Sequence, residues 1–105
     1  MKIKLTDAAQ VIRSKNSGPY ELTLDVIFKD RDLFERACRA KSFNPVLVSR
    51  LYGVPEDKIV NIVEFAPAKA VKITIVRPIA SGDLGETDVY GAQQHAPLLG
   101  LELEL

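Results

Sequence analysis

The sequence predicts an α+β domain in which helices cover one face of a four-stranded, mixed or antiparallel sheet. Runs in which apolar and polar residues alternate indicate strands, and runs with apolar residues three and four positions apart indicate amphipathic helices. Both kinds of run occur in one chain of 105 residues. An amphipathic helix needs an apolar surface to cover, and the apolar faces of the strands provide it. We therefore expect a single domain over residues 1–105.

The N-terminal half contains three predicted helices and one strand. A short helix is expected from Thr6 to about Ser14, because threonine and aspartate at its start can cap its first turn. Residues 20–28 alternate between apolar and polar over most of their length and predict a half-buried strand, with Asp25 on its polar, solvent-facing side. Helices are expected over 30–40 and over 45–52, the second opened by an Asn-Pro pair.

The C-terminal half contains three predicted strands and a long loop. The apolar run 59–65 indicates an inner strand, and a short turn joins it to a strand over 70–76 in an antiparallel hairpin. A loop over 77–97 precedes a last strand over 99–105. The helical crossover after the first strand favours a ferredoxin-like arrangement with an additional N-terminal helix. The glycine-rich loop, which stands where that arrangement has its second helix, departs from the ideal.

The composition limits the classes of function. Lysine plus arginine equals aspartate plus glutamate, fourteen of each, so charge gives no reason to expect a nucleic acid or a membrane as partner. The N-terminus lacks the apolar core of a signal peptide, and we expect a cytoplasmic protein. Cys38 is the only cysteine and lies on the apolar stripe of a predicted helix, which indicates a small core residue and not a nucleophile. No cofactor motif is present.

Two polar segments are candidates for a site. The first runs from Arg13 to Gly18 and is expected to be a turn between helix and strand. Its two cations, two hydroxyls, amide and glycine suit a phosphate or a carboxylate. The alternative is a solvated turn with local hydrogen bonds. The candidate ligand-binding residues in this segment are Arg13, Ser14, Lys15 and Asn16.

The second segment is the loop 77–97. Its histidine is a natural general acid or base, unless neighbouring groups merely fix it in place. Three acids within six residues invite a divalent-cation interpretation, but their spacing fits no EF-hand, and no metal is expected. The candidate catalytic residues are His95, Tyr90 and Asp83, and the candidate ligand-binding residues are Ser81, Gly82, Gln93 and Gln94.

Three stretches resemble a small bacterial domain family of unknown function, which is encoded beside, or fused to, relatives of acyclic terpene utilisation protein A. The stretches are RSKNSGPYELTLD, RLYGVPED and SGDLGETDVYGAQQHAPLL. The resemblance implies a larger partner protein connected with acyl-CoA or small carboxylic acid catabolism. It also implies a ferredoxin-like fold, and its motifs fall on 13–18 and 81–97.

Three hypotheses about function remain open. The first is an accessory subunit that docks on a larger enzyme of carboxylic acid or acyl-CoA catabolism and contributes its polar loop to a shared site. The second is a stand-alone lyase or hydratase that uses His95 as acid or base. The third is a non-catalytic module for ligand binding or homo-oligomerisation. Small size and zero net charge, together with the resemblance, favour the first.

Overall fold

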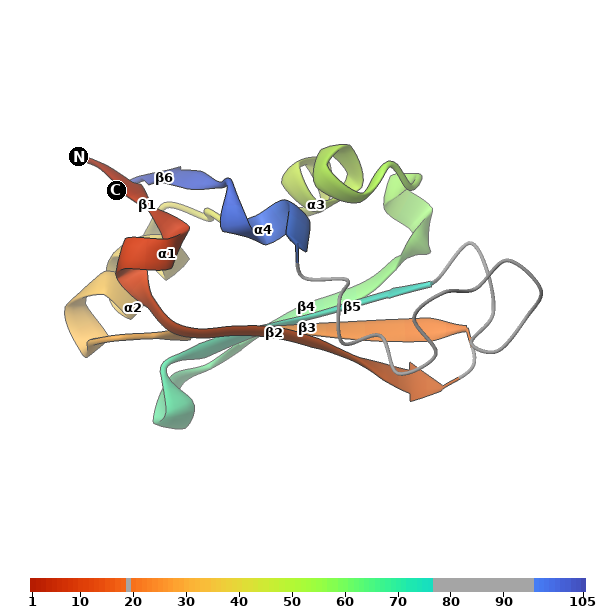
Figure 1. The fold of residues 1–105 in the computed structure, drawn as a ribbon, viewed down its shortest axis with the longest axis horizontal. Coiled ribbons are helices and arrows are strands. Elements are labelled where there is room, and N and C mark those ends of the chain that lie inside the picture. Colours follow the sequence, from red (N-terminus) through yellow and green to blue (C-terminus); the bar gives the residue numbers. More distant parts are fainter. Residues whose placement is uncertain (19, 77–95) are drawn as a thin grey trace.

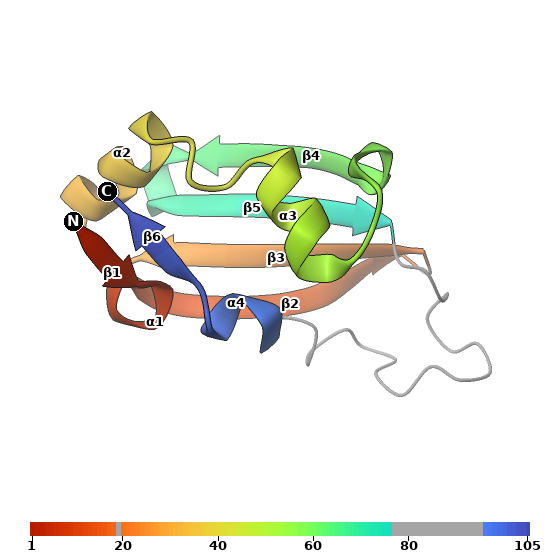
Figure 2. The same cartoon turned by 90° about the horizontal axis from the view of Figure 1, so that it is seen from above.

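The computed structural model describes residues 1–18, 20–76 and 96–105, and in these the domain has two layers (Figure 1). One layer is an antiparallel sheet of four strands in the order β2-β3-β5-β4. The other contains the α-helices and a two-stranded ribbon, which lie in front of the sheet in Figure 2. The elements are β1 (Lys2–Lys4), α1 (Leu5–Ala8), β2 (Ala9–Gly18), β3 (Glu21–Phe28), α2 (Arg31–Arg39), α3 (Pro45–Tyr52), η1 (Glu56–Lys58), β4 (Ile59–Phe65), η2 (Ala66–Ala68), β5 (Ala70–Val76), α4 (Ala96–Leu99) and β6 (Glu102–Glu104).

The core lies between the sheet and the helices. Alternate residues of β3 and β5 face the helices, and Phe28 meets the rings of Phe34 and Phe43 edge to face, with centroids 6.1 and 6.4 Å away. Burial of this apolar surface is the main force that holds the helices on the sheet. The largest fully buried side chains are those of Leu5, Leu22, Leu24, Val26, Phe28, Val48, Ile73 and Leu98.

Local signals correctly predicted β3, α2, α3 and the β4–β5 hairpin. The Asp30 carboxylate accepts a hydrogen bond from the Leu33 amide at 2.8 Å and caps α2. Asn44 accepts one from the Leu47 amide at 2.9 Å and caps α3, and Gly53 ends that helix in the left-handed region at φ 64°. These ends depend on neighbouring residues only, which is why the sequence indicates them.

The predicted N-terminal helix to Ser14 is wrong beyond its first turn. Helix α1 ends at Ala8, and residues 9–18 form β2, which pairs with β3 from Ala9↔Phe28 to Gly18↔Glu21. The β-branched residues Val11 and Ile12 favour a strand. Pairing with β3 gives the backbone N–H and C=O groups of residues 9–18 hydrogen-bond partners. The segment from Arg13 to Gly18, expected to be a turn, is therefore part of a strand.

Two further expectations about strands are corrected. Strand β4, expected to be an inner strand, forms an edge, because β5 and not β4 pairs with β3. Only Glu102–Glu104 of the predicted last strand is extended, and it pairs with β1 in a separate ribbon, not in the main sheet. Lysines lie opposite glutamates in this ribbon, at Lys2↔Glu104 and Lys4↔Glu102, where opposite charges favour pairing.

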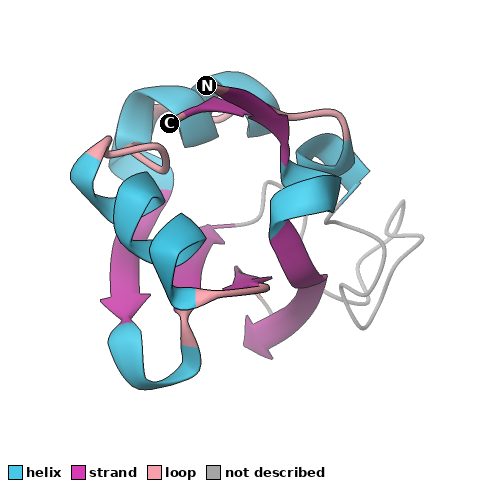
Figure 3. Ribbon diagram, turned by 90° about the vertical axis from the view of Figure 1, so that its left-hand side faces the viewer, coloured by secondary structure: helices cyan, strands magenta, loops and turns pink. Residues whose placement is uncertain are grey.

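The α+β class with helices on one face is confirmed, whereas the ferredoxin-like arrangement is not. Figure 3, turned to view the molecule from its end, shows the α-helices and the ribbon on one side of the main sheet. Tyr20, the first residue of the predicted strand 20–28, lies before β3 and is exposed. In the described part of the chain, every helix is too short or too polar to cross a membrane.

Candidate functional site on the outer face of the sheet

The face of the sheet that points away from the α-helices is here called the outer face. It carries the buried carboxylate of Asp25. Residues paired directly across an antiparallel sheet lie on the same face, so the strand register identifies its members. None of the described α-helices covers it (Figure 1). Its residues are Val11, Arg13 and Lys15 of β2; Glu21, Thr23, Asp25 and Ile27 of β3; Ala70, Lys72, Thr74 and Val76 of β5; and Asn61, Val63 and Phe65 of β4.

A charged row crosses three strands in the middle of this face. Asp25 lies on β3, with Arg13 opposite it on β2 and Lys72 opposite it on β5. Arg13 Nε donates to Asp25 Oδ2 at 3.0 Å. The Asp25 side chain is only 4% exposed, whereas that of Arg13 is 61% exposed. A carboxylate is thus buried under a guanidinium that faces solvent.

The second oxygen of this carboxylate, Asp25 Oδ1, is buried and has no hydrogen-bond partner in the described residues. A buried polar atom without a partner costs about 1–3 kcal/mol. Such a group is more informative about function than an exposed carboxylate, because the fold holds it at a cost. Asp25, expected to face solvent, is therefore the best candidate for a functional carboxylate in the described chain.

The next row of the outer face adds a third cation and two hydroxyl groups. Lys15 lies opposite Thr23, and Thr23 lies opposite Thr74. Together with Arg13 and Lys72, Lys15 gives three positive charges around the single charge of Asp25. Glu21 lies one row further, near the end of β3. The arrangement is suited to hold an anion, since ammonium, guanidinium and hydroxyl groups all donate hydrogen bonds.

The structure separates the four candidates of the first polar segment. Arg13 and Lys15 lie on the outer face, beside Asp25 and Thr23. Ser14 and Asn16 lie on the helix-covered face, because they pair with the core residues Leu24 and Leu22. A strand sends alternate side chains to opposite faces, so the four residues do not form one cradle.

The candidates of the second polar segment lie outside the described residues. They are Ser81, Gly82, Asp83, Tyr90, Gln93, Gln94 and His95. Their roles therefore stay predictions. Lys72, Thr74 and Thr23 were missed in the sequence, although their places on the polar sides of alternating strands were a usable signal.

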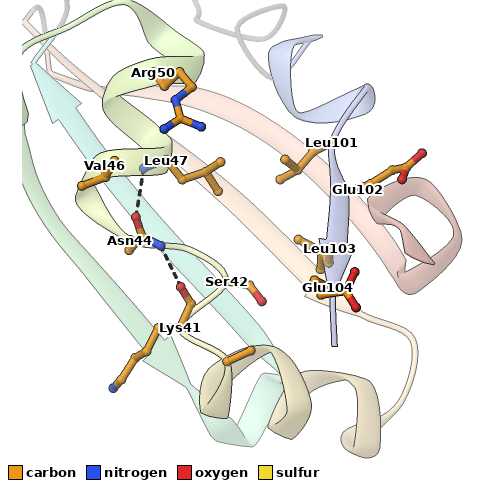
Figure 4. Close-up of a pocket in the computed structure, with 11 residues that line it drawn as sticks. Lys41, Ser42, Asn44, Val46, Leu47, Arg50, Leu101, Glu102, Leu103 and Glu104 are labelled. Carbon is orange, nitrogen blue, oxygen red and sulfur yellow. Dashed lines mark hydrogen bonds between the residues drawn. The ribbon is translucent and has the colours of Figure 1, made fainter. Parts of the chain in front are cut away.

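A groove on the helix side offers less chemistry (Figure 4). It has a volume of about 320 Å³ and lies between α3, the segment before it, and β6. The Asn44 side chain is occupied there, because it accepts from the Leu47 amide and donates to the Lys41 carbonyl. Arg50 extends toward the space between α3 and Leu101. Among the described residues, no group of three histidine, cysteine or acidic side chains suits a metal ion.

Cys38 is a poor nucleophile. Burial raises the pKa of its thiol from 9.0 to about 11, and the Glu64 carboxylate contributes by accepting a hydrogen bond from the thiol and by its charge. Burial also raises the pKa of Tyr52 well above its usual value of 10.0. These two groups keep their protons in the folded state at neutral pH, in agreement with the interpretation of Cys38 as a packing residue.

We expect Cys38 to react with a thiol reagent at pH 8 about a hundredfold more slowly than an unperturbed cysteine, because the raised pKa lowers the thiolate fraction by that factor. The folded state holds this proton more tightly, so the group's stabilising contribution is complete below pH 9.0 and is lost as the pH rises toward about 11. The modification rate at pH 8 checks the expectation, with Glu64→Gln expected to react faster. A native rate equal to that of a free peptide cysteine would contradict it.

The fold and the outer face define a small α+β domain with an open-faced antiparallel sheet and a charged patch around one buried carboxylate. The model of the family described as a domain of unknown function (DUF4387) matches residues 5–102, so the chain belongs to this family. No curated protein and no solved structure matches the chain.

Proposed function

We propose that the chain is a small accessory subunit of a larger enzyme of carboxylic acid or acyl-CoA catabolism, and that it docks through the outer face of its sheet. The observation that carries the proposal is the pair of exposed apolar side chains, Val63 and Phe65, on the same face as the buried carboxylate of Asp25. Val63 is 44% exposed and Phe65 is 50% exposed.

The composition of the outer face supports contact with a protein. Aromatic residues and arginine are enriched in protein interfaces, and the outer face carries one of each, Phe65 and Arg13. Here Val63 lies opposite Lys72, in the row that continues to Asp25 and Arg13.

The resemblance of the sequence to domains encoded beside relatives of acyclic terpene utilisation protein A supports the class of partner. Under this proposal the loop 77–97, with His95, Tyr90 and Asp83, completes a site that the larger protein shares. The acyl-CoA or carboxylate chemistry then belongs to the complex, and the small chain supplies binding groups.

Val63→Lys is expected to weaken co-purification with the larger protein encoded beside it by about tenfold or more, since a charge placed within an apolar contact must be desolvated. Val46→Lys is the matched control, because Val46 is 52% exposed but lies on α3, in the helix layer. It is expected to bind as the native chain does.

Equal binding by both lysine variants would overturn the outer face as the docking surface. Light scattering of the chain alone shows whether a second copy of this chain, and not the larger protein, occupies the outer face. A homodimer that Val63→Lys dissociates and Val46→Lys does not would assign the face to another copy of this chain and would contradict the proposed docking.

A further inference from the structure

We propose that the outer face binds a small dianion, a phosphate group or a dicarboxylate, between Arg13, Lys15 and Lys72, with Asp25 as the residue that positions Arg13. The inference rests on the proposed function only in assigning this ligand to the shared site. It adds the ligand class, and it adds Lys72 and Asp25 to the residues responsible.

Asp25 is buried although its partner Arg13 is exposed. Its carboxylate accepts a single hydrogen bond in the described residues, from Arg13 Nε, while Oδ1 remains without a partner. A buried carboxylate that served packing alone would be costly compared with an apolar residue of similar size. Its retention beneath an exposed arginine is explained if the carboxylate fixes the guanidinium for another contact.

Arg13 keeps hydrogen-bond donors that its contact with Asp25 does not use. A guanidinium has five N–H donors in a rigid plane. The bond to Asp25 uses the one on Nε. The two Nη groups therefore retain donors in a plane that the Asp25 contact orients, and this is the geometry that recognises planar carboxylates and phosphates.

The three cations lie close enough together to contact one small ligand. Adjacent strands lie about 4.8 Å apart, and alternate residues along one strand lie about 7 Å apart. Arg13 and Lys72 are thus separated by two strand spacings, and Lys15 is one row along from Arg13. Long side chains from these positions can converge on one small ligand. The rows that hold these cations contain one acid, Asp25, and Glu21 lies one row beyond Lys15, so the outer face as a whole has a net charge of +1. A ligand with two negative groups can contact Arg13 and a lysine at the same time, and this favours a dianion over a monoanion.

Movement of Lys72 toward the ligand would also give Asp25 Oδ1 a hydrogen-bond donor. Lys72 lies directly opposite Asp25 and is exposed. When an anion draws its ammonium across the sheet, that group can donate both to the ligand and to Asp25 Oδ1. The hydroxyls of Thr23 and Thr74, in the row of Lys15, supply further donors.

The test is a nuclear magnetic resonance titration of the full chain alone with inorganic phosphate, succinate and acetate, at constant ionic strength. We expect phosphate, succinate or both to shift the amide signals of residues 13, 25 and 72, and acetate to bind about tenfold more weakly. The dianion that binds more tightly shows whether the ligand is a phosphate or a dicarboxylate. The absence of shifts at these residues would overturn the proposal.

Lysine variants test the site by charge. Lys72→Gln is expected to weaken dianion binding about three- to tenfold through the loss of one charge-assisted contact. Lys2→Gln is the matched control, since Lys2 is an exposed strand lysine of the ribbon in the helix layer, and it is expected to leave binding unchanged. An equal effect of the two substitutions would overturn the site.

Asp25→Asn separates positioning from simple attraction. If the patch attracts anions only by its charge, loss of the Asp25 charge makes binding tighter. If Asp25 positions Arg13, as proposed, binding becomes weaker. Should the variant not fold, Arg13→Lys answers the same question, because it keeps the charge but removes the planar fork: weaker binding supports the proposal, and unchanged binding overturns it. The larger protein is absent from these experiments, so their failure is distinct from failure of docking.

Discussion

Phe28→Ala is expected to lower the free energy of unfolding by about 3–5 kcal/mol, the usual cost of removing a fully buried aromatic ring. Phe28 has no exposed surface and packs edge to face on Phe34 of α2 and on Phe43, which precedes α3. One ring thus joins β3 to the helix layer at two places. Because domains of this size are stable by only about 5–15 kcal/mol, the loss is a large fraction of the total.

Urea denaturation measures this effect, and Phe65→Ala provides the control. Phe65 is also a strand phenylalanine but is 50% exposed on the outer face. Its truncation leaves no core cavity and is expected to cost about 1 kcal/mol or less. If the two substitutions cost the same, the core is not centred on Phe28.

Arg13→Gln is expected to destabilise the domain by about 1–3 kcal/mol, more than an exposed arginine ordinarily contributes. Exposed ion pairs are worth about 0–1 kcal/mol. Here, however, the partner is buried, and loss of Arg13 leaves the Asp25 carboxylate without its ion pair. The greater cost arises from the unpaired carboxylate and not from the arginine, whose own side chain is largely in solvent.

A double-mutant cycle in urea tests that explanation. Arg13→Gln with Asp25→Asn is expected to be less destabilised than the sum of the two single variants, because no buried charge remains. Arg39→Gln on α2 is a control for general loss of arginine and is expected to change stability little. Strict additivity of the Arg13 and Asp25 substitutions would mean that the ion pair does not couple the two residues.

The parts of the fold that could be predicted are those that local sequence determines. The caps at Asp30 and Asn44, the end at Gly53 and the alternation of β3 all depend on neighbouring residues. The parts that could not be predicted depend on distant partners. Residues 9–18 adopt a strand because β3 is available to pair, and β4 lies at the edge because β5 occupies the place beside β3.

The candidate site shows the same division. Polar composition predicted Arg13 and Lys15 as ligand-binding residues, and both lie on the outer face. The importance of Asp25 was not predictable, since its burial follows from the strands that pair on either side of it. Lys72 joins the site only through the register of β3 and β5. The acid–base role expected for His95 concerns a residue outside the described part of the chain.

If the outer face of the sheet is the interaction surface, its exposed valine should respond to the larger protein. Methyl nuclear magnetic resonance of the valine-labelled chain, with the larger protein added, measures this response. We predict that the Val63 methyl signals shift or broaden on complex formation, while those of Val46, which is similarly exposed but lies on α3, stay unchanged. A response at Val46 with none at Val63 would contradict it.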